Sequence, residues 1–346
     1  MKRLHLFLIL SVALFISSCA PRPHAILPEL TDKEIKIAMI LPYKQIGRYA
    51  HTTSNAVFAY FLAKECPFAL KNFQIDDESP EEIERVLSAI RAEGFRYVIA
   101  PLTQKGARVI TQSEGELNIF FPTINKNDLT TTAQNIYFGA IDHKAQIERL
   151  IPFADSPLVI MYDKSPRGEQ LLKETQESYL GAGNEKVIAY AIDRETTNLK
   201  HLLEKNEEIQ SGTFFLNTPV IKSTMIVSQL SFYQVNAANI LSTQTNYDPL
   251  MLTMTQEEDR EKLYIANSIS SNSDLLVETN SLLSNDIAYD WINYASAVGA
   301  DYFFHELTGE ERTFQLPMVN NQIIYPVSIV KPSGSRFKVV EEGVLP

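Results

Sequence analysis

The sequence is poor in the residues that carry redox and metal chemistry. It has only two cysteines, Cys19 and Cys66, so it excludes a small disulfide-rich scaffold. No two of its six histidines lie three or four residues apart, which excludes the helical histidine pair of many zinc sites. These histidines are His5, His24, His51, His143, His201 and His305.

Positive charge and catalytic signatures are also scarce. Lys and Arg number 31 against 42 Asp and Glu, a net charge of −11, which disfavours a nucleic-acid partner or a broad basic face for membranes. The chain has no G-x-S-x-G, P-loop or G-x-G-x-x-G motif. S-x-x-K begins at Ser328 and at Ser335, but both matches lie in predicted strands and lack the companion motifs S-D-N and K-T-G. We therefore expect no enzyme activity and no cofactor.

The N-terminus has the order of segments found in exported proteins. Lys2 and Arg3 precede an apolar run from Leu4 to Ile16, which is shorter than the about 20 residues that span a bilayer. Such a run suits the core of a signal peptide. The following stretch Ile16-Ser17-Ser18-Cys19 resembles a lipobox.

The lipobox resemblance implies that residues 1–18 are a lipoprotein signal peptide and that Cys19 becomes the acylated first residue, carrying fatty acids such as palmitate. Several acyl chains at one residue anchor firmly, since each buried CH₂ contributes roughly 0.8 kcal/mol. An ordinary signal peptide or a short membrane helix is the alternative. Ala20 stands where an Asp retains enteric lipoproteins at the inner membrane, so we expect a lipid-anchored, periplasm-facing protein at the outer membrane rather than the inner one. Residues 19–34, with three prolines, are expected to form a tether.

From Ile35 onward, short apolar runs alternate with segments of helical periodicity. Ile35 to Leu41 is continuously apolar, as in a strand buried on both faces. Ser79-Pro80 is a strong helix start, and Gly94 marks that helix's end. The other predicted helices are 49–64, 105–115, one with its apolar face over 147–154, 169–180, 198–209, 223–233 and 285–307. The other predicted strands are 73–75, 97–100, 119–121, 136–141, 158–162, 187–191, 213–216 and two within 322–340. This alternation predicts an α/β protein with parallel sheets flanked by helices, in two lobes.

Several stretches carry a resemblance to a known family. They are 37–42 (IAMILP), 98–102 (VIAPL), 135–139 (NIYFG), 157–168, 287–301 and 307–309. The chain resembles the type I periplasmic binding fold and, within it, the LpoA-like outer-membrane lipoproteins that activate penicillin-binding proteins. The resemblance implies a two-lobed periplasmic-binding-like domain over 35–346. It implies crossings between lobes near Asp142, within 267–272 and near Thr313, with lobe one at about 35–142 and 272–312 and lobe two at about 143–271 and 313–346.

Two functions follow from this resemblance. The first is a regulator of peptidoglycan synthesis that binds a penicillin-binding protein, although the helical-repeat domain of the best-known activators has only a tether in its place. The second is a solute-binding receptor that serves the permease of an ABC importer, for a small polar ligand such as an amino acid. The first loop, Pro42 to Tyr49, has a single glycine, whereas amino-acid-binding members have a glycine-rich loop there.

Candidate ligand residues follow the predicted strands. Ligands of open parallel sheets bind beyond the carboxyl ends of the strands, and two facing lobes would place those ends along one cleft. The candidates from the first lobe are Tyr43, Thr103, Gln104, Asn125 and Asp142; those from the second are Tyr162, Asp163, Asn217 and Thr245. Each is equally compatible with a solvated loop position. The run Asp76-Asp77-Glu78 suits either a metal or acid–base site or a helix N-terminus, and the helix N-terminus is favoured.

Overall fold

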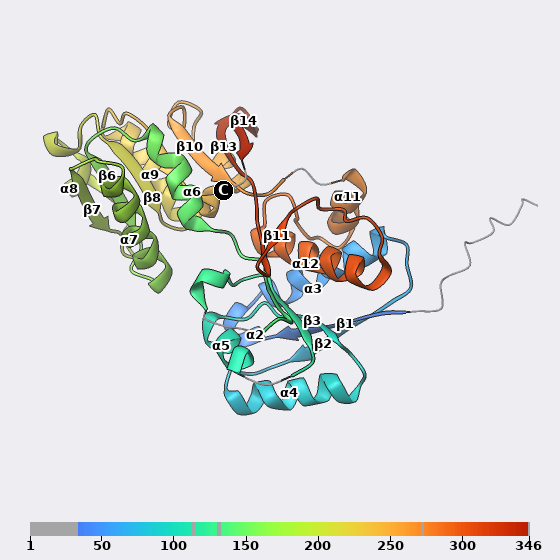
Figure 1. The fold of residues 1–346 in the computed structure, drawn as a ribbon. Helices are drawn as coiled ribbons and strands as arrows, with labels where there is room; N and C mark the ends of the chain where they lie inside the picture. Colours follow the sequence, from blue (N-terminus) through green and yellow to red (C-terminus); the bar gives the residue numbers. More distant parts are fainter. Residues whose placement is uncertain (1–33, 113–114, 130–132, 271–272, 345–346) are drawn as a thin grey trace, which may run out of the picture. The chain divides into compact units, whose positions relative to one another are not determined.

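The computed structural model describes residues 34–112, 115–129, 133–270 and 273–344. The predicted signal peptide, Cys19 and nearly all of the predicted tether lie outside the described residues. The described part consists of two seven-stranded sheets, each covered by helices on both faces (Figure 1). The predicted α/β class with two lobes is confirmed.

The first sheet belongs to the first lobe and has the order β11-β12-β5-β4-β3-β1-β2. Its strands are β1 (Ile35–Leu41), β2 (Phe68–Gln74), β3 (Tyr97–Ile99), β4 (Asn118–Phe121), β5 (Ile136–Phe138), β11 (Met318–Val319) and β12 (Gln322–Ile323). All neighbouring pairs are parallel except β11 with β12. Met39 of β1 packs in the core on one face and Ile40 in the core on the other, which explains the unbroken apolar sequence of that strand.

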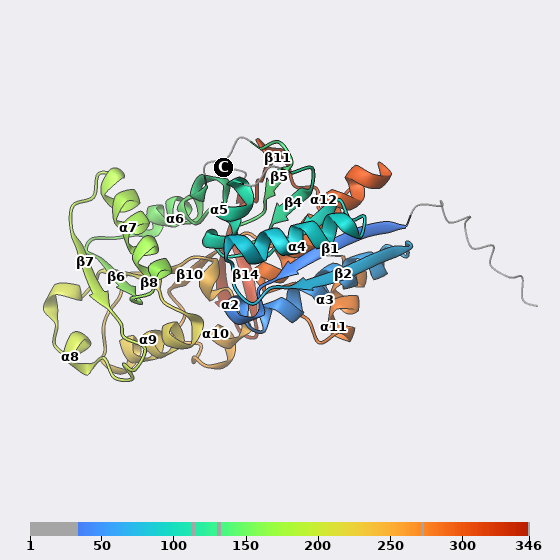
Figure 2. The same cartoon turned by 90° about the horizontal axis from the view of Figure 1, so that it is seen from below.

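Helices cover both faces of the first sheet (Figures 1 and 2). One face packs against α3 (Tyr49–Ala63), α11 (Asp274–Leu282) and α12 (Trp291–Thr308). The other face packs against α4 (Pro80–Ala92) and α5 (Gln104–Gln112). The short helix α2 (Tyr43–Ile46) and the 3-10 turn Lys126–Asp128 follow strand ends.

The second sheet belongs to the second lobe and has the order β14-β13-β10-β9-β8-β6-β7. Its strands are β6 (Leu158–Tyr162), β7 (Val187–Ala191), β8 (Thr213–Asn217), β9 (Ile240–Ser242), β10 (Leu263–Asn267), β13 (Val327–Ser333) and β14 (Arg336–Val344). One face packs against α6 (His143–Leu150) and α7 (Pro166–Gly181). The other packs against α8 (Lys200–Leu203), α9 (Val220–Phe232) and α10 (Pro249–Thr253). The 3-10 turns of this lobe are Ile151–Phe153, Glu207–Ile209 and Gln244–Asn246.

The chain passes between the lobes three times. The first two passages follow β5 and β10. The third lies between Ile323 and Val327 rather than near Thr313, because β12 pairs with β5 through Gln322 and Phe138. The pairing of β12 with β5 is reinforced by Asn321, whose side-chain amide donates to the carbonyl of Ile136 at 2.9 Å.

Two predicted helices have other bounds in the structure. The helix expected at 198–209 is only α8 and a separate 3-10 turn, because Lys205 adopts a positive φ of 56° and Asn206 caps the turn. The helix expected at 285–307 begins at Trp291, where Asp290 accepts from the backbone N–H groups of Ile292 and Asn293. The elements α10, α11, β9 and β10 were not predicted.

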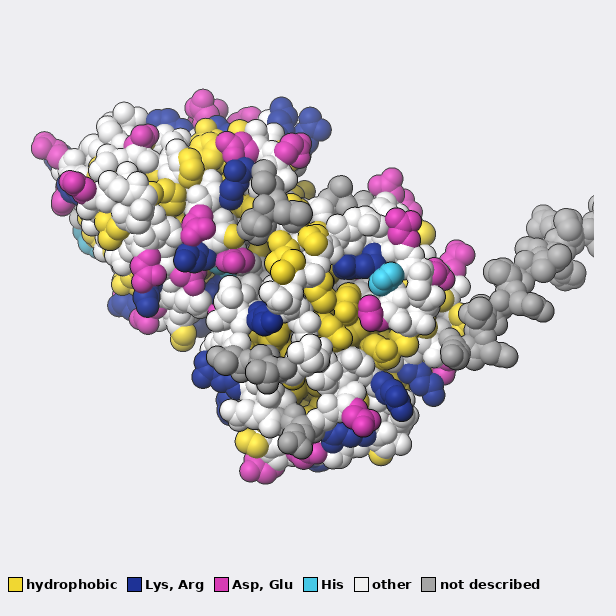
Figure 3. Space-filling view, in the orientation of Figure 1, with side chains coloured by type: hydrophobic (Ala, Val, Ile, Leu, Met, Phe, Trp, Pro, Cys, Tyr) yellow, Lys and Arg dark blue, Asp and Glu magenta, His cyan; other side chains and the backbone are white. Residues whose placement is uncertain are grey.

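The surface carries both charges. Acidic and basic side chains are interspersed over the face shown in Figure 3, without a broad basic area among the described residues there. No helix in the described ranges is long and apolar enough to cross a membrane.

Candidate functional site

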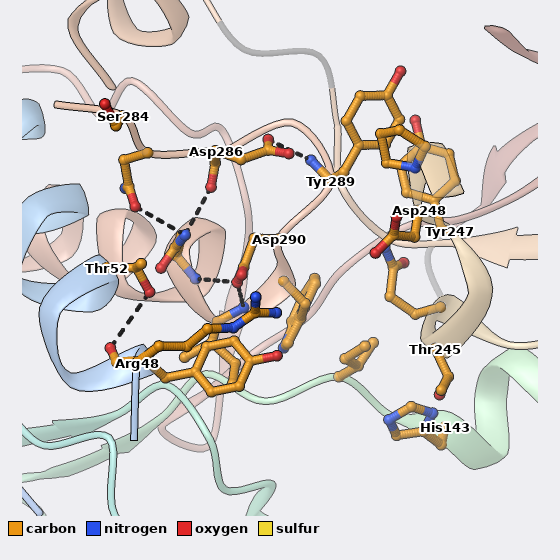
Figure 4. A pocket seen from close by; sticks show the side chains of 18 residues that line it. Arg48, Thr52, His143, Thr245, Tyr247, Asp248, Ser284, Asp286, Tyr289 and Asp290 are labelled. Carbon is orange, nitrogen blue, oxygen red and sulfur yellow. Dashed lines mark hydrogen bonds between the residues drawn. The ribbon is translucent and has the colours of Figure 1, made fainter. Parts of the chain in front are cut away.

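A pocket of about 560 Å³ is lined by residues of both lobes. The first lobe supplies the start of α3 and the segment around the start of α12, with Arg48, Tyr49, Asp286, Asp290 and Trp291. The second lobe supplies the start of α6 and the segment between β9 and α10, with His143, Thr245, Tyr247 and Asp248. Figure 4 shows Arg48 and Asp290 on one side of the hollow and Tyr247, Asp248, Thr245 and His143 on the other.

A second pocket of about 430 Å³ continues the first. The two share Ile141, His143, Trp291 and Ile292 in their walls. The second pocket adds Thr103, Gln104 and Asp128 from the first lobe and Arg167 from the second. The residues that line these two pockets are called the cleft below.

Three aspartates of the cleft hold their positions by capping turns and helices. Oδ1 of Asp248 accepts from the backbone N–H of Leu250 at 2.8 Å, at the start of α10. Oδ1 of Asp286 accepts from Tyr289 at 3.0 Å, and Oδ1 of Asp290 accepts from Ile292 at 3.0 Å. Within the described ranges, the Oδ2 atoms of all three accept no hydrogen bond from the protein. Each carboxylate therefore has an oxygen left for a ligand.

Arg48 contributes a guanidinium group to the wall of the 560 Å³ pocket. Its Cζ atom lies 5.3 Å from the centroid of the Tyr49 ring. The pKa of Arg48 is raised, first by its interaction with Tyr49 and then by the negative charges of Asp290 and Asp248. Burial in the cleft wall raises the pKa of the Asp290 carboxyl, and the charge of Asp286 raises it further. A cation beside this desolvated carboxylate would stabilise its charged form.

An aromatic cluster borders the cleft where the lobes touch. The ring of Tyr247, from the second lobe, lies 5.1 Å from that of Tyr289, which precedes α12, and 4.7 Å from that of Phe337 in β14. Burial raises the pKa of Tyr247 to about 12. Its phenol therefore stays neutral at physiological pH and can donate a hydrogen bond.

His143 lies where the two pockets meet. It is half-buried, and its Nδ1 atom is shielded from solvent without a hydrogen-bond partner among the described residues. Burial lowers the pKa of His143 well below its ordinary value, and the positive charge of Arg167 lowers it further. The imidazole is therefore neutral in the folded protein at pH 7 and adds no charge to the cleft.

Three of the predicted candidates line the cleft: Thr103, Gln104 and Thr245. The hydroxyl of Thr103 donates to buried Glu78, and the Nε2 of Gln104 donates to the carbonyl of Asp128 at 2.8 Å. Both therefore already have partners in the protein. Thr245 is exposed, and its hydroxyl is 3.2 Å from that of Thr243.

Asn125 and Asp142 line a separate pocket of about 230 Å³ beside the passages between the lobes. The carboxylate of Asp142 caps α6, accepting from Ala145 at 3.0 Å. Four other candidates line none of these three pockets: Tyr43, Tyr162, Asp163 and Asn217. Asn217 is buried and donates to the hydroxyl of Thr175 at 3.0 Å.

The acidic run at 76–78 serves helix starts, as favoured: Asp77 accepts from the N–H of Ser79 just before α4, and Glu78 serves the start of α5. Glu78 is 2 % exposed and accepts from the backbone N–H groups of Thr103 at 2.8 Å and Gly106 at 3.0 Å. Carboxylates are stabilised at such a position by the free N–H groups of the first turn. Within the described ranges, no group of three or more His, Cys, Asp and Glu side chains is placed to hold a metal ion.

Sequence reasoning missed the charged and aromatic residues of the larger pocket. Arg48, Tyr247, Asp248, Asp290 and Trp291 precede or open helices instead of directly following a predicted strand. One signal was present: Asp248-Pro249 is a helix start with a capping aspartate and a proline in the first turn. Asp290 is a similar cap, but the predicted helix already ran through it.

No protein-family model and no curated protein sequence matches this chain. Solved structures do. The leucine-binding protein LivK of Thermotoga maritima has a TM-score of 0.65 at 14% identity, over 90% of this chain and 99% of its own. A benzoate-bound solute-binding protein of an ABC transporter from R. palustris has a TM-score of 0.63 at 12% identity, over 91% and 98%.

The chain has the type I periplasmic binding fold. Full-length LpoA of Haemophilus influenzae also matches, with a TM-score of 0.58 at 11% identity, over 89% of this chain and 59% of LpoA. The similarity to LpoA therefore holds at the level of the fold, and this chain spans 59% of that protein. At these sequence identities, similarity to the solved structures is evidence for the fold alone.

Proposed function

We propose that this protein is a non-enzymatic solute-binding lipoprotein of the cell envelope, which holds a small polar molecule between its lobes. One observation carries the proposal: charged, hydroxyl and aromatic side chains from both lobes line one continuous cleft. A binding site shared by two lobes lets a ligand draw them together, as in hinge closure. The convergence favours the receptor over the activator of peptidoglycan synthases, for which a featureless cleft would suffice.

Binding can be tested with the detergent-solubilised full chain in a thermal-shift screen of small metabolites. We expect at least one compound to raise the melting temperature in a concentration-dependent way. Thr245→Trp fills the cleft from an exposed position and should abolish that shift. Thr197→Trp, at an exposed loop position outside the cleft, is the matched control. A ligand whose shift survives Thr245→Trp would bind elsewhere and contradict the proposal.

We further propose that lipids on Cys19 anchor the protein in the outer membrane, facing the periplasm. The lipobox-like sequence and Ala20 support this. Cells fed labelled palmitate should incorporate it into the wild-type chain and not into Cys19→Ser. The wild type should also fractionate with outer membranes. Label retained in Cys19→Ser would place the lipid on another residue.

The second candidate is the activator of a penicillin-binding protein. It is favoured by the fold similarity to LpoA and by exposed apolar side chains beside a surface pocket of about 660 Å³ between α9 and α10. Phe232 is 75% exposed there and Met254 is 49% exposed. Clustered apolar exposure of this kind is typical of protein-binding surfaces.

The two candidates are separated by affinity capture from solubilised envelopes with the lipidated chain as bait. Recovery of a penicillin-binding protein, repeated with purified components and lost in Phe232→Ser, would support the activator. Leu282→Ser, at an 83% exposed position in α11, is the matched control. Recovery of an ABC permease would support the receptor.

A further inference from the structure

The 560 Å³ pocket of the cleft has an excess of negative charge. Its wall holds three carboxylates, Asp248, Asp286 and Asp290, against the single guanidinium of Arg48. Each carboxylate accepts backbone hydrogen bonds through Oδ1, and its Oδ2 accepts none within the described ranges. Arg48 forms no ion pair among the described residues, so these acids are not neutralised by direct contact.

A buried amide in the same wall also lacks a partner. Asn293 lines the pocket and is 1% exposed. Its Nδ2 donates to Oδ1 of Asn285 at 3.2 Å and to the carbonyl of Asp286 at 2.8 Å, which fixes the orientation of the amide. Its Oδ1 therefore is an acceptor, and it has no hydrogen-bond partner in the described structure. An unsatisfied buried acceptor is costly, and a donor on a ligand would relieve that cost.

Aromatic rings complete the wall. Tyr49, Tyr247, Tyr289 and Trp291 all line this pocket, from both lobes. The faces of such rings attract cations, most strongly where water is excluded. An anionic ligand would instead be desolvated beside three carboxylates, which is unfavourable.

We propose that the ligand of this pocket is a small organic cation, a compound with an ammonium or guanidinium group and a net positive charge. The inference rests on the proposed solute-binding function and narrows it to one chemical class. The free carboxylate oxygens and Oδ1 of Asn293 accept hydrogen bonds from the cationic group, and the rings enclose its apolar part. This class differs from benzoate, which the similar solved protein from R. palustris holds.

Calorimetric titration of the solubilised full chain tests the inference. The cationic probes are putrescine, agmatine, choline and L-arginine, and the comparison probes are benzoate and isoleucine. Compounds retained from a metabolite extract are identified by mass spectrometry in parallel. We expect saturable binding of a cationic compound that weakens with added salt, because surface charge attraction is screened.

Two variants remove charge and keep the fold. Asp248→Asn and Asp290→Asn each retain an amide oxygen that can cap the helix, since Asn caps as well as Asp. Each should weaken cation binding about tenfold, and the double variant more. Asp155→Asn, at an exposed position outside the cleft, should bind like the wild type.

The outcomes separate this inference from the proposed function. If only anionic or neutral compounds bind, and Thr245→Trp abolishes their binding, the cation inference is overturned and the receptor stands. If a cation binds equally well to the Asp248→Asn, Asp290→Asn double variant, the inference is likewise overturned. If neither the probes nor the extract yields any ligand, both fail.

Discussion

Asp301 lies fully buried in α12, and its carboxylate joins three parts of the first lobe. It accepts from the hydroxyl of Tyr60 in α3 at 2.8 Å and from the backbone N–H of Thr313 at 2.6 Å. The Nε atom of Arg312 lies 3.3 Å from Oδ2. The pKa of Tyr60 is raised by burial and by this carboxylate, so the phenol remains a donor. One buried charge thus holds the segment after α12 against α3.

We predict that Asp301→Asn lowers the free energy of unfolding by about 3 kcal/mol, because it leaves the largely buried Arg312 without its counter-charge. Urea denaturation measures the change. Glu177→Gln, in an exposed ion pair with Lys173, should cost no more than about 0.5 kcal/mol. A loss as small for Asp301→Asn as for Glu177→Gln would show that the network adds little to stability.

His143 gives a second prediction, on pH. The pKa of His143 is lowered in the folded state and is about 6.5 in the unfolded state. Below pH 6.5, therefore, the imidazole binds a proton in the unfolded chain and stays unprotonated in the folded chain. Stability therefore falls as the pH drops through this window, by no more than about 1.4 kcal/mol per pH unit for one proton. His143→Gln removes this loss.

Denaturation midpoints at pH 7.5 and pH 5.5 provide the measurement. The wild type should lose more stability over this interval than His143→Gln. His201→Gln, at an exposed position in α8, should behave like the wild type. Equal losses in all three proteins would mean that His143 is free to protonate in the folded state.

At single residues, sequence patterns predicted local roles better than long-range ones. Ser79 caps α4 as expected, accepting from Glu82 at 3.4 Å. Glu82 does not return the hydrogen bond to the backbone N–H of Ser79, because its carboxylate binds Arg85 and that N–H donates to Asp77. Which of several nearby partners a side chain binds depends on the three-dimensional geometry, and the spacing of residues in the sequence does not specify that geometry.

Among the elements, α12 depends on a close approach to the first sheet. A Cβ atom at Gly299 would lie 2.4 Å from Cδ1 of Phe120 in β4. Phe120 is fully buried, and its ring packs 6.2 Å from that of Phe303. The small residue therefore sets how closely the helix packs on the sheet.

We predict that Gly299→Ala destabilises the protein by about 1–3 kcal/mol through overpacking, although alanine is the better helix former. Phe120→Leu should relieve the clash, so the double variant should lose less stability than the two single variants lose in sum. Thermal unfolding of the four proteins completes the cycle. Purely additive losses would mean that α12 shifts to accommodate the methyl group.

The elements predicted well are those whose ends carry clear capping and terminating residues. The helix from Pro80 to Ala92 has a cap, a first-turn proline and Gly94 at its end, and its bounds were predicted closely. The start of α12 was set too early because Ile287 is buried like a helix-face residue but belongs to the preceding segment. Short elements such as α8 and α10 offer too few turns for a periodic pattern.

Across the whole molecule, the order of strands and helices predicted two lobes, but it did not predict the wall of the cleft. Arg48, Asp248 and Asp290 are separated by long stretches of sequence and line one pocket because the chain passes to the second lobe after β5 and returns after β10. The rule that ligands lie beyond strand ends found Thr103, Gln104 and Thr245. It could not find side chains that helix starts bring into the same space.

The sole tryptophan of the chain offers the most direct measurement of ligand binding in the cleft. Trp291 is half-buried and lines both pockets, so its fluorescence reports on this site alone. Titration of the solubilised full chain with a stabilising ligand should change this fluorescence saturably, at the concentrations that raise the melting temperature. The change should disappear at the same concentrations in Asp248→Asn, Asp290→Asn double variants if the ligand is a cation. A ligand that stabilises the protein without altering Trp291 fluorescence would bind outside the cleft and contradict the account.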